Sequence, residues 1–405
     1  MRRLAWMLLL VLVFTIPWEY SLDFGEPWGN VARLAGLALL LAAIPAVLQA
    51  RRIRATGAFH WMVLALFLWF CCSVFWSIDP RRTGARLPGY FQEMAIIWFL
   101  WEFTESRDDL DSLLRAYVAG AWVLALLTVG NLVFPGTPGQ VRFVPEGQDP
   151  NDVARFLVLG LSMAALLIEN ERGWLKRILV IGYLPLGSAG ILLTASRGGF
   201  LAAVVALGGC GILLARKHVR AVMAGVAALP LLAAVLWMAA PHETLLRIST
   251  IPEQLMGGDL NQRWNIWAAG WATFARAPVA GWGAGSFVLA AGLAPIDTAH
   301  NTALALATEG GFVAVGLGAS ILVLCVVALM KSEGPVRVAL ATALAAWLFL
   351  SLVSNVQESR STWFLLGMIA VAGRLGAESA VRVRGCPPSS MEYRPAPGTI
   401  SGVED

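Results

Sequence analysis

Residues 178–215 read ILVIGYLPLGSAGILLTASRGGFLAAVVALGGCGILLA. This stretch consists of two apolar runs, 178–194 and 200–215, joined by a short segment that contains SRGG. Each run is close to the length of about 20 residues that a helix needs to cross the hydrocarbon core of a bilayer. The pattern predicts two transmembrane helices with a tight connection, and it places an arginine between them at the membrane surface.

The rest of the chain has the same character. Of its 405 residues 58% are hydrophobic and only 14% are charged, and 17 are tryptophans, which is far from the average of soluble proteins. This composition predicts an all-α polytopic membrane protein. Twelve apolar runs qualify as spans: 4–18, 31–49, 58–76, 88–103, 116–134, 153–168, 178–194, 200–215, 221–240, 301–330, 338–355 and 361–377.

Basic residues are divided unequally between the two predicted membrane faces. With twelve spans and a cytoplasmic start, 19 of the 30 Lys and Arg residues, including all three lysines, fall on the cytoplasmic side. The cations expected outside are all arginines, whose planar guanidinium groups bind phosphate through paired hydrogen bonds. This favours an outer site for a phosphate-bearing ligand, although arginine outnumbers lysine throughout the chain. The outer arginines are Arg33, Arg81, Arg82, Arg86, Arg142, Arg155, Arg197, Arg247, Arg263, Arg276 and Arg360.

Three outer segments are long enough to contain a site, namely 77–91, 135–152 and 241–299. We expect residues 1–378 to form one transmembrane domain in which 241–299 is a large outer loop between spans 9 and 10. The tail 379–405 is rich in Pro, Gly and Ser, so it is predicted to be a disordered cytoplasmic segment.

The large outer loop contains an amphipathic helix signal, DLNQRWNIWAAGWATFARAP, at 259–278. Asp259 and Gln262 stand at the two positions of a capping box, and Pro278 ends the run. Arg263 lies at the edge of an aromatic stripe, so we expect its guanidinium at the depth of the lipid headgroups. Such a stripe is typical of the membrane interface. Its members are Leu260, Trp264, Trp267, Trp271 and Phe274.

Two residues at the mouths of spans could carry chemistry. Arg197 opens a span, and Gly198 and Gly199 would let the backbone approach a ligand or a neighbouring helix closely. The structural alternative is an arginine that extends to the interface from a helix end. His300, in TAHNTALALATEGGF, is a candidate general base, because imidazole titrates near neutrality; its alternative is a hydrogen-bonded structural histidine. Glu309 lies about 13 Å deeper, so it is expected to pair with another helix rather than with His300.

Other polar residues near the outer surface are weaker candidates. Arg142 and Asn151 come from VRFVPEGQDPNDVARF (141–156), where Asn151 could simply cap the following helix, and Arg86 comes from SVFWSIDPRRTGARLPGY (73–90). The carboxylates on this side are scattered, and four of the five cysteines fall within spans. We therefore expect no disulfide, no metal site and no cofactor.

Several short motifs occur in an order that resembles the O-antigen ligase and polymerase superfamily. They are WSIDP (76–80), QDPND (148–152), TASRGGFLA (194–202), QRWNIW (262–267), GWGAGSF (281–287) and AHNTALALATEGG (299–311). The size of the chain, its twelve spans and its dominant late outer loop look most like a lipopolysaccharide O-antigen ligase.

The resemblance implies a GT-C-like glycosyltransferase of the bacterial inner membrane. It would transfer O-antigen polysaccharide en bloc from undecaprenyl diphosphate to a sugar hydroxyl of lipid A-core oligosaccharide, at the periplasmic face, without a metal and with inversion. Residues 1–378 would then be the catalytic domain, with 241–299 a periplasmic loop. Partners would be the two lipid-linked substrates and membrane lipids, and no nucleic acid.

The resemblance also implies roles for individual residues. Arg197 and Arg263 would bind the diphosphate, and His300 would activate the acceptor hydroxyl. Arg86, Arg142, Asn151, Asn301, Trp264 and Trp267 would contribute to substrate binding. Electrostatic stabilisation of the leaving diphosphate by fixed guanidinium groups is consistent with this chemistry.

Three other functions fit part of the pattern. A protein-directed O-oligosaccharyltransferase is a further relative, but such enzymes tend to be longer and to carry an additional C-terminal region. A Wzy-type polymerase would use the same donor but extend a second lipid-linked glycan, a difference that these motifs barely encode. A transporter or flippase for an anionic lipid would need polar groups along a path through the bilayer, whereas the ionisable residues near span ends concentrate outside.

Overall fold

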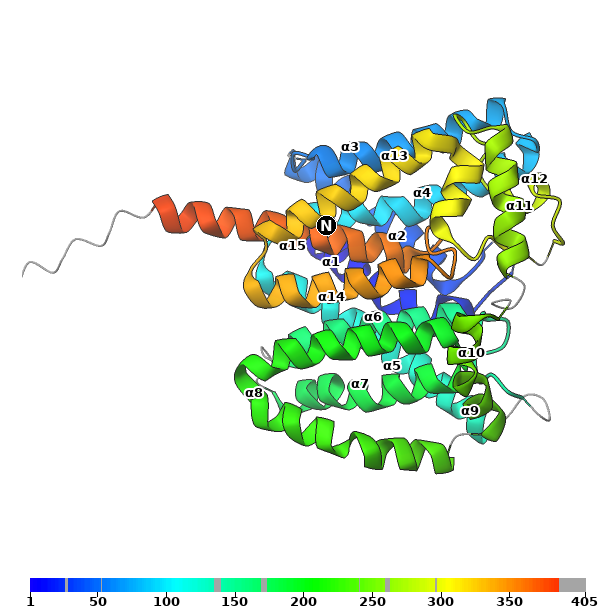
Figure 1. The fold of residues 1–405 in the computed structure, drawn as a ribbon. Coiled ribbons are helices and arrows are strands. Elements are labelled where there is room, and N and C mark those ends of the chain that lie inside the picture. Colours follow the sequence, from blue (N-terminus) through cyan, green and yellow to red (C-terminus); the bar gives the residue numbers. More distant parts are fainter. Residues whose placement is uncertain are drawn as a thin grey trace, which may run out of the picture.

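The structure is a bundle of long helices that run between two ends of the molecule (Figure 1). This computed structural model describes residues 1–25, 28–51, 53–134, 140–168, 173–239, 241–258, 263–295 and 297–385. These residues form no β-strand, only an isolated bridge between Asp23 and Asn30. The helices are α1 (Arg2–Thr15), η1 (Ile16–Ser21), α2 (Val31–Ala50), α3 (Ala58–Cys72), η2 (Ser73–Phe75), α4 (Pro80–Phe103), α5 (Arg107–Val133), α6 (Pro150–Ile168), α7 (Trp174–Leu193), α8 (Arg197–Ala239), α9 (His242–Ser249), α10 (Ile251–Met256), α11 (Arg263–Arg276), α12 (Phe287–Ala290), α13 (Thr302–Lys331), α14 (Gly334–Ser351) and α15 (Arg360–Gly385).

Ten helices among the described residues are long and apolar enough to cross a membrane. The expectation of an all-α polytopic membrane protein is therefore confirmed. The count of twelve spans stays a prediction, because two expected spans are not among these ten. Residues 88–103 lie in α4, which carries Arg86, Glu93 and Glu102. Of the expected span 221–240, residues 221–239 fall in the second part of α8, and residue 240 lies outside the described residues.

Helix α8 doubles back on itself. Its path is interrupted at His218, whose φ and ψ of −126° and 40° are not helical. Figure 1 shows the two parts of α8 as antiparallel segments. Arg197, at the start of α8, donates to the carbonyl of Arg247, which follows its end. Both ends of α8 therefore lie at the same end of the bundle.

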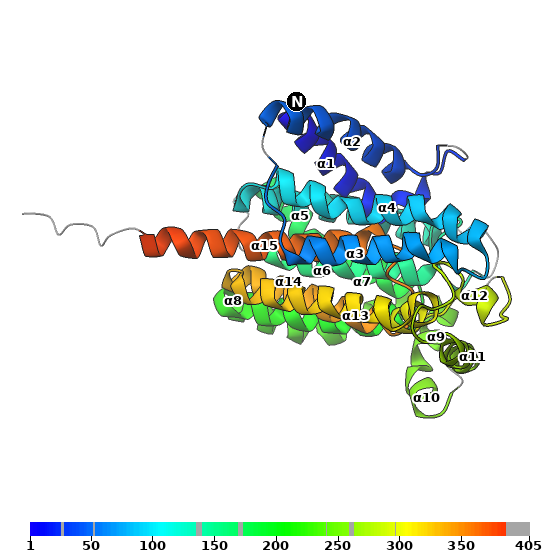
Figure 2. The ribbon, with the colours of Figure 1, turned by 90° about the horizontal axis from the view of Figure 1, so that it is seen from above.

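The three segments expected outside the membrane meet at one end of the bundle. The amide of Ile78 donates to the carbonyl of Trp282 at 3.1 Å, and the hydroxyl of Thr244 donates to the carbonyl of Val141 at 2.9 Å. We call this end, which carries α9 to α12, the loop end. The opposite end, where α15 continues past residue 378 to Gly385, is the tail end (Figure 2). Residues 386–405 of the expected tail lie outside the described residues.

Helix α6 is the most buried of the ten spans, because 83% of its apolar stretch lies inside the protein. It packs against α5, α7, α8 and α14. The packing is close at Gly160, where a Cβ atom would lie 2.5 Å from the hydroxyl of Tyr183. That hydroxyl donates to the carbonyl of Leu157 at 2.8 Å. Because α6 is fixed on all sides, the residues of its first turn have a defined position at the loop end.

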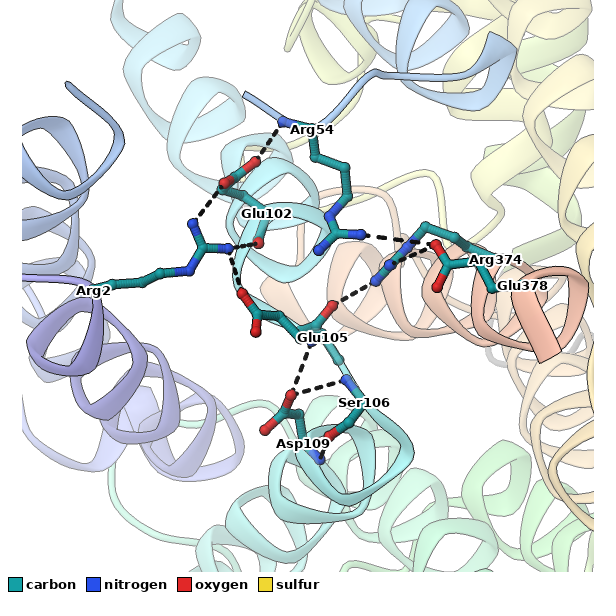
Figure 3. Close-up of polar contacts among 9 residues, drawn as sticks. Arg2, Arg54, Glu102, Glu105, Ser106, Asp109, Arg374 and Glu378 are labelled. Carbon is teal, nitrogen blue, oxygen red and sulfur yellow. Dashed lines mark hydrogen bonds and ion pairs between the residues drawn. The ribbon is translucent and has the colours of Figure 1, made fainter. Parts of the chain in front are cut away.

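An ionic network joins four parts of the chain at the tail end (Figure 3). Glu102, at the end of α4, accepts from the Arg2 guanidinium at 3.2 Å and from the backbone amide of Arg54 at 2.8 Å. Arg374 pairs with Glu378 at 3.2 Å, and its guanidinium also donates to the carbonyl of Thr104. These contacts tie α1, the α2–α3 connection, α4 and α15 together.

We predict that the Glu102→Gln substitution destabilises the protein. The substitution removes the negative charge from a side chain that is only 12% exposed and weakens the two hydrogen bonds that it accepts. The free energy of unfolding should fall by about 1–3 kcal/mol. The matched control is Glu105→Gln, because Glu105 also pairs with Arg2 but is 58% exposed, and exposed pairs contribute about 0–1 kcal/mol. Thermal unfolding in detergent should show a lower Tm for Glu102→Gln than for Glu105→Gln. Equal Tm values would contradict the structural role of this network.

Candidate active site

The TASRGGF segment forms a three-residue turn between α7, which ends at Leu193, and α8, which begins at Arg197. Ala195 has a φ of 50°, in the left-handed region that non-glycine residues adopt only when their surroundings hold them there. A Cβ atom at Gly199 would lie 2.4 Å from the Cβ of Ala154, and one at Gly198 would lie 2.9 Å from Val353. The two glycines therefore permit close packing against other parts of the protein.

Arg197 and Arg247 hold each other's backbone segments. The Nε of Arg197 donates to the carbonyl of Arg247 at 3.0 Å, and its Nη2 donates to the hydroxyl of Thr250 at 2.6 Å. In return, the Nε of Arg247 donates to the carbonyl of Ala195 at 3.2 Å. These bonds fix both guanidinium groups at the start of α8.

Two more arginines complete a group that we call the arginine cluster: Arg142, Arg197, Arg247 and Arg263. The Nε of Arg142 donates to the carbonyl of Thr194 at 3.2 Å. Burial lowers the pKa of Arg142 to about 10, and the charges of Arg247, Arg263 and Arg197 add to this effect while Asp149 opposes it. Burial likewise lowers the pKa of Arg263, Asp149 again opposes the shift, and Arg197 and Arg247 add to it. The four positive charges are thus close enough to repel one another, and a concentration of positive charge of this kind attracts anions.

Asn151 lies beside the cluster but does not cap α6, which corrects one interpretation of the sequence. The helix begins at Pro150, and the carboxylate of Asp149 accepts from the amide of Asn151 at 2.7 Å. The side-chain oxygen of Asn151 instead accepts from the hydroxyl of Ser196 at 2.7 Å. Asn151 therefore links α6 to the TASRGGF turn.

His300 is presented by a strained and well-anchored backbone. Its φ is 46°, again in the left-handed region. On one side, the indole of Trp267 donates to the carbonyl of Ala299 at 3.0 Å. On the other side, Asn301 caps α13 by accepting from the amide of Leu304 at 3.0 Å, and the amide of Asn301 donates to the side chain of Asn355 at 3.2 Å.

The electrostatic surroundings of His300 keep its imidazole uncharged at neutral pH. Burial lowers its pKa, and the charge of Arg263 lowers it further, whereas Asp149 and Asp297 have the opposite effect. An uncharged imidazole can accept a proton. The charges of Arg263 and Asp149 act on His300 and also on Arg142, so His300 lies next to the arginine cluster. The structure thus brings together His300, Arg197 and Arg263, the three residues expected to be catalytic.

Glu309 anchors the outer loop and does not contact His300. Its carboxylate accepts from the amide of Phe287 at 3.3 Å and from the backbone of Gly285, in the GWGAGSF segment. The sequence predicted that Glu309 pairs with another helix. Its partners are backbone groups of the outer loop, at Gly285 and at Phe287, the first residue of α12. The same segment binds the WSIDP region, since the hydroxyl of Thr83 donates to the carbonyl of Ala284 at 2.9 Å. Both motifs thus support the site by holding the outer loop on α4 and α13.

Gly311 is the point at which α13 bends to receive this loop. Its φ and ψ are 65° and −164°, a region that is essentially limited to glycine. A Cβ atom there would lie 2.1 Å from the carbonyl oxygen of Val279. The bend allows the amide of Phe312 to donate to the carbonyl of Pro278 at 2.8 Å.

We expect Gly311→Ala to lower the stability of the protein by about 1–3 kcal/mol or more. Gly316→Ala is the matched control in the same helix, because a Cβ atom at Gly316 meets nothing within 4 Å and alanine favours a helix by up to about 1 kcal/mol. Tm values and the yield of folded protein after detergent extraction would measure both effects. A Gly311→Ala protein as stable as the control would show that the bend does not need glycine.

Most of the other arginines expected outside lie apart from the cluster. Arg86, an expected substrate-binding residue, pairs with Glu358 at 2.8 Å, and Glu358 also accepts from the hydroxyl of Tyr90 at 3.3 Å. Arg155 pairs with Asp152 at 3.0 Å, and Arg360 pairs with the buried Glu19. Arg276 lies over the ring of Trp282. These four arginines are therefore held by carboxylates or by an aromatic ring, and the expectation that the outer arginines bind phosphate stays a prediction.

The aromatic stripe of α11 is divided between two environments. Trp264 and Trp271 are 68% and 57% exposed, as expected at a membrane interface. Trp267 instead packs on a small cluster that includes Ile266 and Phe287, and its indole is bonded to Ala299. Trp267 therefore positions the backbone next to His300. The expected capping residues Asp259 and Gln262 lie outside the described residues.

Sequence reasoning missed one segment of the site, the α14–α15 connection formed by residues 352–359. Its Val353 contacts Gly198, and its Asn355 accepts from the amide of Asn301. The hydroxyl of Thr302 donates to the carbonyl of Ser354 at 2.9 Å. The run SNVQESRS, which follows an apolar span, was the available signal. Arg247 was recognised only as one of the outer arginines.

No group of three or more His, Cys, Asp or Glu side chains that could hold a metal ion occurs within the residues described above. The expectation that the protein uses no metal stays a prediction. The candidate site is thus an arginine cluster, a neutral histidine and a set of backbone anchors at the loop end.

Comparison with known proteins gives one informative match. Residues 182–319 match the family model described as O-antigen ligase. This region contains Arg197, Arg263 and His300, whereas Arg86, Arg142 and Asn151 precede it. The comparison with curated proteins gives no match. A solved chain from work on the structural coordination of polymerization and crosslinking by a peptidoglycan synthase complex is 18% identical, covers 82% of this chain and 99% of its own length, and has a TM-score of 0.41. A likeness at this level indicates neither a common fold nor a common activity.

Proposed function

Because residues 182–319 identify the chain as a member of the O-antigen ligase and polymerase superfamily, we propose that it is an O-antigen ligase of the bacterial inner membrane. It transfers O-antigen polysaccharide from undecaprenyl diphosphate to a sugar hydroxyl of lipid A-core oligosaccharide, at the periplasmic face. The loop end is then the periplasmic end. The observation that carries this proposal is the arginine cluster beside His300. His300 and three of the four arginines, all except Arg142, lie within the matched region.

The proposed reaction is a single inverting displacement. The acceptor oxygen attacks the anomeric carbon of the first O-antigen sugar, and its proton passes to the imidazole of His300. The bond between the anomeric carbon and the diphosphate oxygen breaks, and its electron pair stays on the leaving diphosphate. The products are the glycosylated lipid A-core and undecaprenyl diphosphate.

The arginine cluster binds the diphosphate and stabilises the charge that develops on it. Guanidinium groups that are already in place when this charge appears need no reorganisation, which is why such groups lower a barrier efficiently. In this proposal they supply the positive charge that metal ions supply in some other transferases, in a GT-C-like arrangement. Arg197 and Arg247 are fixed by backbone carbonyls, so their direction does not depend on the substrate.

We predict that Arg197→Ala, Arg263→Ala and His300→Ala each abolish the capping of lipopolysaccharide in cells while the protein still inserts into the membrane. Loss of one fixed donor commonly costs about 2.7–4 kcal/mol of barrier, or a factor of about 100–1000 in rate. Arg197→Lys should restore little activity, because lysine cannot reproduce the paired donors that reach Arg247 and Thr250. Arg81→Ala is the matched control, an exposed arginine at the same end of the bundle.

The assay with purified protein separates ligase from polymerase. The protein is mixed with an undecaprenyl-diphosphate-linked glycan and either lipid A-core or a second lipid-linked glycan. Extension of lipid A-core supports the proposal, and extension of the second glycan alone would identify a polymerase. Transport of the donor across the bilayer without glycan transfer would overturn both.

A further prediction concerns pH. Since burial and the Arg263 charge lower the pKa of His300, the imidazole stays in its base form until the pH falls below its ordinary pKa of about 6.5. The acid limb of kcat/KM should therefore lie below that value. Asp297→Asn removes a negative charge that raises this pKa, so the limb should move to still lower pH. The residual activity of His300→Gln should lack this acid limb. If the acid limb of its kcat/KM profile stays at the same pH, His300 is not the base.

A further inference from the structure

An apolar groove lies at the tail end of the bundle, between α2 and α4. Its volume is about 320 Å³. One wall consists of residues of α2 and the other of residues of α4, and the α2–α3 connection closes the groove at the end where Arg54 and Glu102 lie. Helix α2 packs mainly on α1, and Figure 2 shows these two helices together on one side of the bundle, beside α4. The groove is thus remote from the arginine cluster, which lies at the loop end.

The groove is accessible from the side of the bundle. Ile44 and Leu48, which line its α2 wall, are 51% and 71% exposed. Helix α2 is one of the ten helices that are long and apolar enough to cross a membrane. Exposed apolar side chains on such a helix face lipid chains, so a lipid can enter the groove laterally.

The lining changes from polar to apolar along the groove. Arg54 and Glu102 lie at its tail end, and Trp101 lies beside them on α4, as is typical of the depth of lipid headgroups. From Leu48 the α2 wall continues through apolar residues only as far as Leu40, about 12 Å along the helix. A charged end followed by an apolar channel matches a phospholipid, in which a charged headgroup is attached to acyl chains.

The guanidinium group of Arg54 is available to a ligand at the polar end. Its side chain is 27% exposed, and among the described residues its one ion-pair partner is Glu378, at 3.8 Å. Glu378 also pairs with Arg374, at the shorter distance of 3.2 Å, so one carboxylate serves two arginines (Figure 3). Glu102, the carboxylate in the groove, already accepts from Arg2 and from the amide of Arg54. The charge of Arg54 is therefore only partly balanced, which favours a phosphate at this end of the groove.

Trp101 holds the polar end of the groove in place. Its indole donates to the carbonyl of Ala55 at 3.0 Å, and the Arg374 guanidinium lies over its ring, 5.0 Å from the centroid. The neighbouring amide of Arg54 is bound to Glu102 at 2.8 Å. The segment that carries the Arg54 side chain is thus fixed to α4 before a ligand binds, which lowers the cost of binding.

Other arginines at the tail end favour an anionic lipid over a neutral one. Arg51 follows the end of α2, and Arg3 lies in the first turn of α1. Both are exposed, and no carboxylate pairs with either of them among the residues that the structure describes. Basic residues beside the ends of membrane-spanning helices attract anionic lipids.

We propose that this groove binds an anionic phospholipid, with its phosphate on Arg54 and the adjoining part of one acyl chain between α2 and α4. The bound lipid fills the space between the α1–α2 pair and α4 and so stabilises the bundle at the tail end. The lipid site is separate from the candidate active site and does not depend on the proposed function.

The test uses the full chain, purified in an uncharged detergent and titrated with phosphatidylglycerol or with phosphatidylcholine that has the same acyl chains. A ligand that binds the folded protein raises its Tm, and native mass spectrometry counts the bound lipids. We expect phosphatidylglycerol to raise the Tm at about tenfold lower concentration than phosphatidylcholine does. An equal effect of the two lipids would overturn the proposal. An equal effect of glycerol phosphate, which has no acyl chain, would also overturn it.

Arg54→Gln tests the contact with the headgroup. It should raise the phosphatidylglycerol concentration needed for half of the Tm increase about tenfold, close to the value for phosphatidylcholine. Arg3→Gln is the matched control, because it removes the same charge at the same end from an exposed arginine that does not line the groove. Equal losses in the two variants would show a general attraction of anionic lipids and would exclude a site at Arg54.

Ile44→Trp tests the contact with the acyl chain. It adds volume at an exposed position of the lining, so the Tm increase produced by either lipid should be largely lost. Leu41→Trp is its control, three residues earlier on the same helix, 73% exposed and outside the lining. Both positions are exposed, so the two variants should have the same Tm without lipid. If Ile44→Trp responds to phosphatidylglycerol as Leu41→Trp does, no acyl chain occupies the groove and the proposal fails.

Discussion

The loop end depends on holding four like charges together. Arg197, Arg247 and Arg142 donate to backbone carbonyls of Arg247, Ala195 and Thr194. Carbonyl oxygens fix the direction of a guanidinium group without cancelling its charge. Burial lowers the pKa of Arg142, and the charges of the other three members of the cluster lower it further, while Asp149 opposes the shift. The protein thus maintains an unfavourable concentration of positive charge in a half-buried place, and binding of a multivalent anion would relieve it.

Several other arginines at the same end of the bundle are paired with carboxylates. Arg86, Arg155 and Arg360 each pair with a carboxylate, respectively from Glu358, Asp152 and Glu19. Pairing offsets the free-energy cost of burying a charge inside a helical bundle. Two of these pairs join separate parts of the chain, α4 with the α14–α15 connection and α15 with η1, whereas the Arg155–Asp152 pair lies within α6. Three arginines of the cluster, Arg142, Arg197 and Arg247, donate to backbone carbonyls, and the charge of Asp149 acts on Arg142 and Arg263.

The sequence predicted the elements of the site better than their contacts. Apolar runs on both sides of TASRGGF predicted α7 and α8, and the position of Arg197 at a helix start followed directly. The role of Gly198 and Gly199 could not be predicted, because their neighbours Val353 and Ala154 are remote in the sequence. The helical spacing of the tryptophans defined a stripe on α11, but periodicity does not tell what a stripe packs against, and Trp267 turned out to hold the backbone beside His300. The α14–α15 connection was missed for the same reason, since Asn355 acts through a contact with Asn301, 54 residues away.

Three helices begin at the site, and the way in which each start is capped fits an anion site. The start of α8 is capped by the hydroxyl of Ser196, which accepts from Gly199 at 3.1 Å, and that of α13 is capped by the amide oxygen of Asn301. These neutral caps satisfy free backbone amides without opposing the partial positive charge of a helix start. At α6 the corresponding acceptor is the carboxylate of Asp149, the same group that opposes the lowering of the pKa of Arg142, Arg263 and His300. One carboxylate therefore moderates the repulsion within the cluster while the two helix starts nearest Arg197 and His300 remain positive. In the proposed reaction the leaving diphosphate would lie near the starts of α8 and α13, with the sugar attached to it toward His300.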